Sequence, residues 1–268
     1  MGTYQKATII GAGNLGLAIA KGLVKANKFE ASQITLTRRS TASIDYLSKD
    51  GFALSTNNSK AVAESDIIFL CVQPKQIEGV INEIREALNS EKTVVSVATG
   101  VKTPELTKLL SKEVTVIRAM PNTAIAVNQS MTCICGADGT SENHLEEVKN
   151  LFDSVGKTLV INEELMQAAT VLGASGIAFF LRYIRAATQG GIQMGFDSDE
   201  ANFIAVQTAI GASSLIQAFE NHPESEIDRV TTPRGCTIEG LNEMEHQGLS
   251  SAVIKGIMAS FHKINDIR

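Results

Sequence analysis

A glycine-rich turn near the start of the chain constrains the fold more than any other feature. Residues 7–10 are apolar and strand-like, and Gly11, Gly13 and Gly16 follow with the spacing G-x-G-x-x-G, ahead of a helix-forming run. A strand, a glycine turn and a helix in this order open a dinucleotide-binding βαβ unit. Gly11 permits the tight turn, Gly13 lets the backbone approach a pyrophosphate, and Gly16 lets the helix pack closely on the sheet. The pyrophosphate is expected at the helix N-terminus, where unpaired N–H groups favour negative charge.

The end of the second predicted strand indicates which dinucleotide binds. An NAD site usually carries Asp or Glu there, to accept a hydrogen bond from the ribose 2′-hydroxyl. This chain instead has Arg38 and Arg39, flanked by the hydroxyls of Thr37 and Ser40. Guanidinium groups suit a 2′-phosphate, so the sequence favours NADP(H), with NAD(H) as the alternative. The competing interpretation is a plain glycine loop followed by two solvated arginines.

Composition excludes several classes of protein. The 268 residues suffice for one large or two ordinary domains, and 44% are apolar. The net charge of −5 gives no basic footprint, so nucleic acid is not an expected partner. No run is expected to be long enough to span a membrane, and no signal peptide is recognised, so a cytoplasmic protein is predicted.

The cysteines and histidines do not predict a metal site. Cys71, Cys133, Cys135 and Cys236 are scattered, and none of their spacings is that of a zinc site. Cys133 and Cys135 share one face of a predicted strand and are expected to be buried thiols.

Strand and helix patterns alternate through residue 161. Strands are predicted at residues 8–10, 34–37, 53–54, 67–72, 93–98, 114–120, 130–135 and 157–161. Helices are predicted at residues 15–25, 41–49, 59–64, 77–88, 104–110 and 141–154. This alternation indicates a parallel, doubly wound sheet, with antiparallel additions allowed at its end.

Beyond residue 161 the strand patterns stop. Residues 163–194, 198–220 and 238–267 are predicted to be long helices, broken near Gly190–Gly191 and Gly248. We therefore expect an α/β domain at residues 1–161 and an all-α domain at residues 162–268. Residues 201–216 carry apolar side chains on more than one face, which indicates a subunit interface, or else cover by the sheet domain.

Several predicted strands end in turns that would face a ligand, because ligands bind outside the carboxyl ends of parallel strands. Cys71 and Val72 lead into Gln73 and Pro74. Residues 96–100 end the next strand with small side chains that leave room for a nicotinamide ring. Asn122 closes the strand after that. The predicted cofactor-binding residues are Gly11, Gly13, Asn14, Leu15, Gly16, Arg38, Arg39, Cys71, Val72, Gln73, Pro74, Ala98, Thr99, Gly100 and Asn122.

Two motifs mark the helical part. Residues 173–178 place small side chains inside a helical run, which indicates either a ligand nearby or close helix packing. Residues 231–237 form a hydroxyl-rich loop that opens a helix, and helix N-termini bind carboxylates. Thr237 is therefore predicted to be a helix cap or a hydrogen-bond donor to a ligand.

These motifs together resemble the pyrroline-5-carboxylate reductase family over the whole chain. The segments that carry the resemblance are residues 11–16, 71–74, 116–123, 175–176, 190–195 and 232–238. The resemblance implies an NADPH-dependent reduction of the C=N bond of 1-pyrroline-5-carboxylate to L-proline. It also implies a Rossmann domain followed by a helical domain that forms homodimers, with further assembly, often into decamers. The chain departs from the family pattern at Ile177, Gln189, Arg229 and Arg234.

The resemblance also implies roles for individual residues. Thr237 would donate a hydrogen bond near the imine nitrogen, and the backbone N–H groups of Gly235, Cys236 and Thr237 would hold the substrate carboxylate. Ser175 and Gly176 would shape the pocket, and Arg234 would be an added counter-ion. Two alternatives stay open: a reductase of a related cyclic imine or oxo acid, and a non-catalytic NADPH-binding sensor. Against a β-hydroxyacid dehydrogenase, residues 163–183 contain no lysine.

Overall fold

The computed structural model describes residues 4–110 and 113–264. The described residues form two compact units. Residues 4–175 group with residues 261–264, and residues 176–260 form the second unit.

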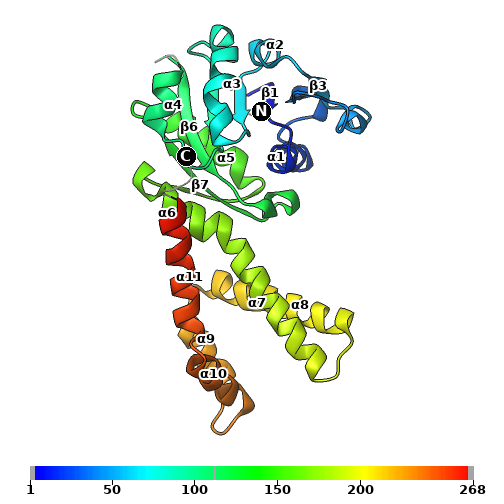
Figure 1. Ribbon diagram of the computed structural model, residues 1–268, viewed down its shortest axis with the longest axis vertical. Coiled ribbons are helices and arrows are strands. Elements are labelled where there is room, and N and C mark those ends of the chain that lie inside the picture. Colours follow the sequence, from blue (N-terminus) through cyan, green and yellow to red (C-terminus); the bar gives the residue numbers. More distant parts are fainter. Residues whose placement is uncertain (1–3, 111–112, 265–268) are drawn as a thin grey trace. The chain divides into compact units, whose positions relative to one another are not determined.

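The first unit is built on one eight-stranded sheet (Figure 1). Its strands are β1 (Ala7–Ile10), β2 (Ile34–Thr37), β3 (Ala53–Ser55), β4 (Ile67–Leu70), β5 (Thr93–Ser96), β6 (Thr115–Met120), β7 (Ser130–Gly136) and β8 (Gly156–Val160). The spatial order is β3-β2-β1-β4-β5-β6-β7-β8. The first six strands are parallel, β7 runs antiparallel to β6, and β8 runs parallel to β7. The doubly wound sheet with an antiparallel addition is confirmed.

Helices and helical turns connect these strands. The α-helices of this unit are α1 (Asn14–Lys25), α2 (Asn58–Ala63), α3 (Ile77–Ile84), α4 (Thr103–Leu109), α5 (Glu142–Asp153) and α6 (Met166–Ala169). The 3₁₀ turns are η1 (Ala31–Gln33), η2 (Asp45–Ser48), η3 (Pro74–Gln76), η4 (Arg85–Ala87), η5 (Thr123–Val127) and η6 (Glu163–Leu165). A π-helical stretch, η7 (Thr170–Ser175), follows α6.

Apolar side chains pack on both faces of the sheet. Ile9 and Phe69 belong to one buried cluster, whereas their chain neighbours Ile10 and Leu70 belong to another. Successive residues of a strand point to opposite faces, so both faces of the central strands are covered. The edge-to-face contact of Phe69 with Phe152 of α5, with ring centroids 6.1 Å apart, lies in the first cluster.

The second unit is helical. Its helices are α7 (Gly176–Gln193), α8 (Ser198–Phe219), α9 (Pro223–Val230), α10 (Cys236–His246) and most of α11 (Leu249–Ile264). Helices α7 and α8 pack on each other, and a Cβ on Gly191 would lie 2.8 Å from the Cβ of Ala201. Phe180, Phe203 and Ile210 are 71%, 71% and 53% exposed in the single chain, although each is strongly apolar. Such a surface is typical of a helical subunit interface.

Two helix predictions were wrong. The helix expected at residues 41–49 is a turn followed by η2, held by i→i+3 bonds such as that from Leu47 N to Ile44 O at 2.9 Å. The Ser48 hydroxyl donates to the backbone oxygen of Asp45 at 2.6 Å, the kind of local bond by which serine competes with helix formation. The break expected near Gly190–Gly191 is also absent from α7. Gly191 lets α7 pack closely against α8. The irregular part of the predicted helix 163–194 is the π-helical stretch η7.

Other boundaries follow the predictions more closely. The break at Gly248 is confirmed, with Gly248 at a positive φ of 80° between α10 and α11. The expected helix at residues 238–267 begins earlier, at Cys236, and residues 265–267 lie outside the described residues. The sequence patterns did not predict α9.

One helical stretch corrects the expectation about membrane-spanning length. The run Glu163–Gln193 is long and apolar enough to cross a membrane by length and composition, because an 18-residue window within it has a mean hydropathy of 1.4. These two properties alone are weak grounds for a membrane span. The run contains the π-helical stretch η7 and the start of the helical unit, where apolar residues also suit contact between subunits.

Candidate functional site

A cavity of about 780 Å³ lies in the first unit, where β1, β2 and β4 end. Its volume falls in the range of cofactor sites. It is lined by Ile10, Gly11, Ala12, Gly13, Thr37, Arg38, Arg39, Ser40, Thr56, Asn58, Cys71, Val72, Gln73, Gln76, Gly79, Val80 and Glu83. Because this edge of a doubly wound sheet is where nucleotides bind, we treat it as the candidate cofactor site.

The glycine turn forms one wall of this cavity. Gly11 has a φ of +98°, and a Cβ there would lie 2.5 Å from the backbone oxygen of Cys71. The N–H groups of Gly11 and Ala12 both donate to Thr37 O, at 3.1 and 3.0 Å. The turn is therefore fixed against both neighbouring strand ends, and only glycine fits at position 11.

Gly13 and Gly16 have different surroundings. A Cβ on Gly13 would meet no atom within 4 Å, whereas one on Gly16 would clash with the carbonyl oxygen of Gly11. Gly16 therefore lets α1 pack against the turn, and Gly13 leaves open space at the helix N-terminus. The first turn of α1 has no acidic residue and no side-chain cap, so its unpaired N–H groups suit an anion.

Arg38 lies close to this turn. Its Nη1 is 3.5 Å from Ala12 O, and both Arg38 and Arg39 are exposed on the cavity wall. Arg38 N also donates to Ser55 O at 3.2 Å, which fixes the backbone at the end of β2. The cavity thus has a cationic end beside the glycine turn.

Sequence reasoning missed Asn58 and Glu83, which also line the cavity. Asn58 Oδ1 accepts from the Thr37 hydroxyl at 2.5 Å, and Asn58 Nδ2 donates to Glu83 Oε2 at 2.9 Å. The three residues come from β2, α2 and α3. No local motif in the sequence connects them, so only the folded sheet brings them together.

Eight of the predicted cofactor-binding residues do not line this cavity. Gly100, at a φ of +83°, instead lines a smaller cavity of about 70 Å³ with Arg118 and Glu163. Ala98 is buried, and its N–H lies 3.4 Å from Ser96 Oγ. The remaining predicted residues outside the cavity lining are Asn14, Leu15, Gly16, Pro74, Thr99 and Asn122.

Asn122 has a structural role in this fold. It is 6% exposed, its Oδ1 caps Ala124 N at 3.0 Å, and its Nδ2 donates to Gly173 O at 3.0 Å. Its own N–H donates to Ser130 Oγ at 3.1 Å. Both polar ends of the side chain are therefore engaged by the protein, and Asn122 ties the end of β6 to η7.

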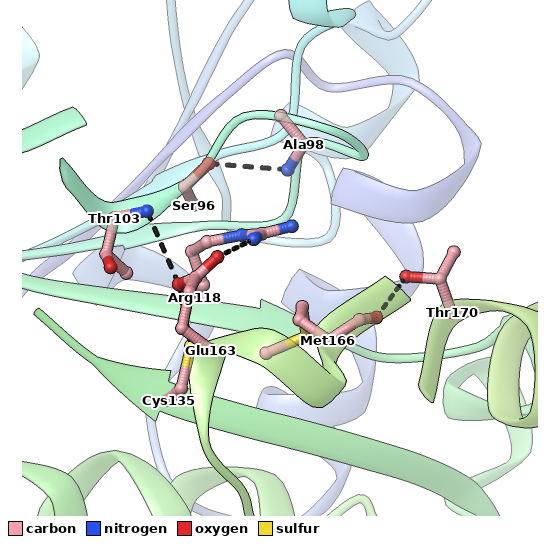
Figure 2. Close-up of polar contacts among 8 residues, drawn as sticks. All are labelled: Ser96, Ala98, Thr103, Arg118, Cys135, Glu163, Met166 and Thr170. Atoms are coloured by element: carbon pink, nitrogen blue, oxygen red, sulfur yellow. Dashed lines mark hydrogen bonds and ion pairs between the residues drawn. The ribbon is translucent and has the colours of Figure 1, made fainter. Parts of the chain in front are cut away.

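A second polar cluster lies at the smaller cavity (Figure 2). The Glu163 carboxylate is ion-paired with Arg118 of β6 and accepts hydrogen bonds from Cys135 Sγ at 3.2 Å and Thr103 N at 3.3 Å. Arg118 is 3% exposed, and its Nε has no hydrogen-bond partner. Glu163 thereby joins β6, β7 and the start of α4 to the first turn of the helical run.

Two of the cysteine thiols, those of Cys71 and Cys135, are held in their protonated form. Burial raises the pKa of Cys71 to about 12, and burial together with the Glu163 carboxylate raises the pKa of Cys135 to about 12. Both thiols stay protonated at neutral pH, so neither is suited to nucleophilic attack. Cys133 and Cys135 are buried, as the strand pattern predicts. In the described ranges, no three His, Cys, Asp or Glu side chains form a group that could hold a metal ion.

The predicted substrate loop lies in the second unit, and its geometry changes two assignments. Gly235, not Thr237, is the N-cap of α10, so the cap interpretation of Thr237 was wrong. The N–H of Gly235 donates to Thr232 O at 2.9 Å and is not free for a carboxylate. Cys236 and Thr237 are the first two residues of α10, where backbone N–H groups have no intrahelical acceptor.

Two further predicted residues stand at special backbone positions. Arg234 has a φ of +60°, which is unusual for a residue other than glycine and orients the loop just before α10. Ser175 ends η7, and the buried Gly176 begins α7. Single π-helical turns inside helices often occur at functional sites.

The sheet and its cavity define a class: a protein with a Rossmann-type dinucleotide-binding domain. Residues 6–100 match the family of NADP oxidoreductases described as coenzyme F420-dependent, and residues 163–267 match pyrroline-5-carboxylate reductase dimerisation. The chain is 41% identical to pyrroline-5-carboxylate reductase 2 of Dictyostelium discoideum, over 97% of this chain and 92% of that protein. The chain belongs to the pyrroline-5-carboxylate reductase family.

Two further similarities agree with this membership. The chain is 44% identical to pyrroline-5-carboxylate reductase 1 of Dictyostelium discoideum over 95% of its length, and it spans 48% of that longer protein. The crystal structure of Plasmodium falciparum pyrroline carboxylate reductase with NADP bound has the same fold, with a TM-score of 0.90. That similarity covers 100% of this chain and 99% of the other at 22% identity.

Proposed function

We propose that this protein reduces 1-pyrroline-5-carboxylate to L-proline with NADPH. The proposal is based mainly on the cavity at the strand ends. This cavity has the uncapped N-terminus of α1 on one side and the two arginines on the other, and the chain belongs to this family. A dinucleotide fits both features: the helix N-terminus would hold the pyrophosphate, and Arg38 and Arg39 would hold a 2′-phosphate. When bound, NADPH supplies the hydride that forms the new C–H bond at the imine carbon.

The residues of the chain would bind and orient the substrate. The free N–H groups of Cys236 and Thr237 at the start of α10 would hold the substrate carboxylate, with Arg234 as a counter-ion. The Thr237 hydroxyl would donate a hydrogen bond near the imine nitrogen, and Ser175 and Gly176 would shape the pocket. A cyclic imine accepts hydride readily once protonated, so positioning is the main contribution of the protein.

The assembly and location are part of the proposal. We place the domain boundary at residue 161, with the α/β domain at residues 1–161 and the dimerisation domain at residues 162–268. This boundary follows the family match at residues 163–267, whereas the compact units divide at residue 175. The exposed apolar side chains of α7 and α8 would pair in a homodimer, with further assembly into a decamer. Sedimentation velocity would measure the assembly. A cytoplasmic location completes the proposal.

Thr237→Ala is expected to lower kcat about a hundredfold while leaving the Kd for NADPH within about twofold, because it removes a donor to the reacting nitrogen. Steady-state reduction of 1-pyrroline-5-carboxylate and NADPH fluorescence titration measure the two effects. Thr237→Ser keeps the hydroxyl and is the matched control, expected to retain most of the activity. An unchanged kcat in Thr237→Ala would remove the role given to this hydroxyl.

Arg38→Ala is expected to raise the KM for NADPH about tenfold or more and to leave that for NADH nearly unchanged, because only NADPH carries the 2′-phosphate. Parallel assays with the two cofactors and the same imine measure this. If both KM values rise equally, Arg38 does not contact the phosphate. A panel of other cyclic imines and oxo acids, assayed alongside, tests the substrate itself.

A further inference from the structure

A carboxylate lies on the wall of the cavity that also carries the two arginines. Arg38 and Arg39 follow β2, whereas Glu83 comes from α3, and all three line the same cavity. None of the ion pairs of the described residues joins Glu83 to either arginine. The cavity wall therefore presents positive and negative charge together, without a direct pair that would neutralise them.

Glu83 is held in place, although it is exposed to solvent. Its Oε1 accepts from Asn58 N at 3.3 Å, and its Oε2 accepts from Asn58 Nδ2 at 2.9 Å. Asn58 is fixed in turn by the Thr37 hydroxyl at the end of β2. The carboxylate is thus linked through Asn58 to Thr37, the residue that precedes Arg38.

In NAD-binding sheets, a carboxylate at the end of the second strand accepts a hydrogen bond from the ribose hydroxyl and repels a 2′-phosphate. This chain has arginine at that position, but Glu83 of α3 places a carboxylate on the wall of the same cavity. A negative charge there opposes a phosphate dianion and has little effect on a neutral hydroxyl.

We infer that Glu83 is a specificity-determining residue for the cofactor, an inference that rests on the proposed function. Its charge weakens NADPH binding relative to NADH binding and so limits the preference that Arg38 and Arg39 create. The balance of these charges, rather than the arginines alone, sets how strongly the protein distinguishes the two cofactors.

Glu83→Gln tests this inference, because glutamine has the same size and its Oε1 can still accept from Asn58 Nδ2. The full-length protein is titrated with NADPH and with NADH, and each Kd is followed by cofactor fluorescence without an imine. The Kd for NADPH is expected to fall about two- to fivefold, with that for NADH changing clearly less. The gain for NADPH should shrink in about 0.5 M KCl, because salt screens exposed charges. A purely structural role of Glu83 would not produce this salt dependence.

Glu78→Gln is the matched control, since Glu78 is an exposed carboxylate of the same helix that does not line the cavity. It is expected to leave both Kd values unchanged. Equal changes for the two cofactors in Glu83→Gln, or a Kd for NADPH that stays the same or rises, would overturn the inference alone. A wild-type protein that binds neither cofactor would overturn the proposed function, and the inference with it.

Discussion

Gly13→Ala is expected to weaken NADPH binding roughly a hundredfold while the fold stays intact. Gly13 has a φ of −92° and a ψ of −165°, which alanine adopts without strain, and no atom lies within 4 Å of the added Cβ. The Cβ would therefore enter only the open space in which the pyrophosphate is expected. Fluorescence titration with NADPH measures the loss, and thermal unfolding shows whether the stability is retained.

The neighbouring glycine supplies the contrast. Gly16→Ala would bring a Cβ against the backbone oxygen of Gly11 and within 2.9 Å of the Ile9 side chain, so it is expected to destabilise the fold by about 2 kcal/mol. Gly13→Ala should change the free energy of unfolding by less than about 1 kcal/mol. If Gly13→Ala binds NADPH normally, the pyrophosphate does not lie at this helix N-terminus.

Glu163→Ala is expected to lower the free energy of unfolding by about 3 kcal/mol, because it leaves a buried arginine without its counter-ion. Arg118 is 3% exposed, and its Nε already lacks a partner, so the loss of Glu163 leaves a largely desolvated charge. The change also removes the acceptor of the Cys135 thiol and of Thr103 N. Urea unfolding of the variant and the wild type measures the difference.

Glu164→Ala is the matched control, since Glu164 is the adjacent, exposed carboxylate and none of the ion pairs of the described residues includes it. It should cost less than about 0.5 kcal/mol. Adding Arg118→Met to Glu163→Ala should recover part of the stability, because the uncompensated charge is then gone. Equal losses in Glu163→Ala and Glu164→Ala would show that the ion pair does not stabilise the fold.

Most of the sheet could be predicted from the sequence because its signals are local. Apolar runs such as Ile67–Leu70, separated by helical patterns, are sufficient to predict parallel strands covered on both faces. The glycine turn could also be predicted. The positive φ of Gly11 and the close packing at Gly16 both require glycine, so the two residues stand at a fixed spacing in the sequence.

The sequence was less informative where the role of a residue depends on its tertiary contacts. Gly191 was expected to break a helix, but it lies against Ala201 inside a helical pair. Asn122 stays a predicted cofactor residue, and the structure adds that its amide joins β6 and η7. Glycine and asparagine have the same local signature in both roles, so only the neighbouring element decides between them.

The sequence by itself determined the α/β fold, the dinucleotide turn and the two arginines that follow β2. Only the tertiary structure decided that Asn58 and Glu83 share the cavity with Arg38, and that Arg118 is buried against Glu163. The physical reason is that a turn or a strand is encoded by adjacent residues, whereas the charge balance of a cavity depends on side chains that come from separate elements. These contacts form only when the sheet brings the ends of its strands and helices together.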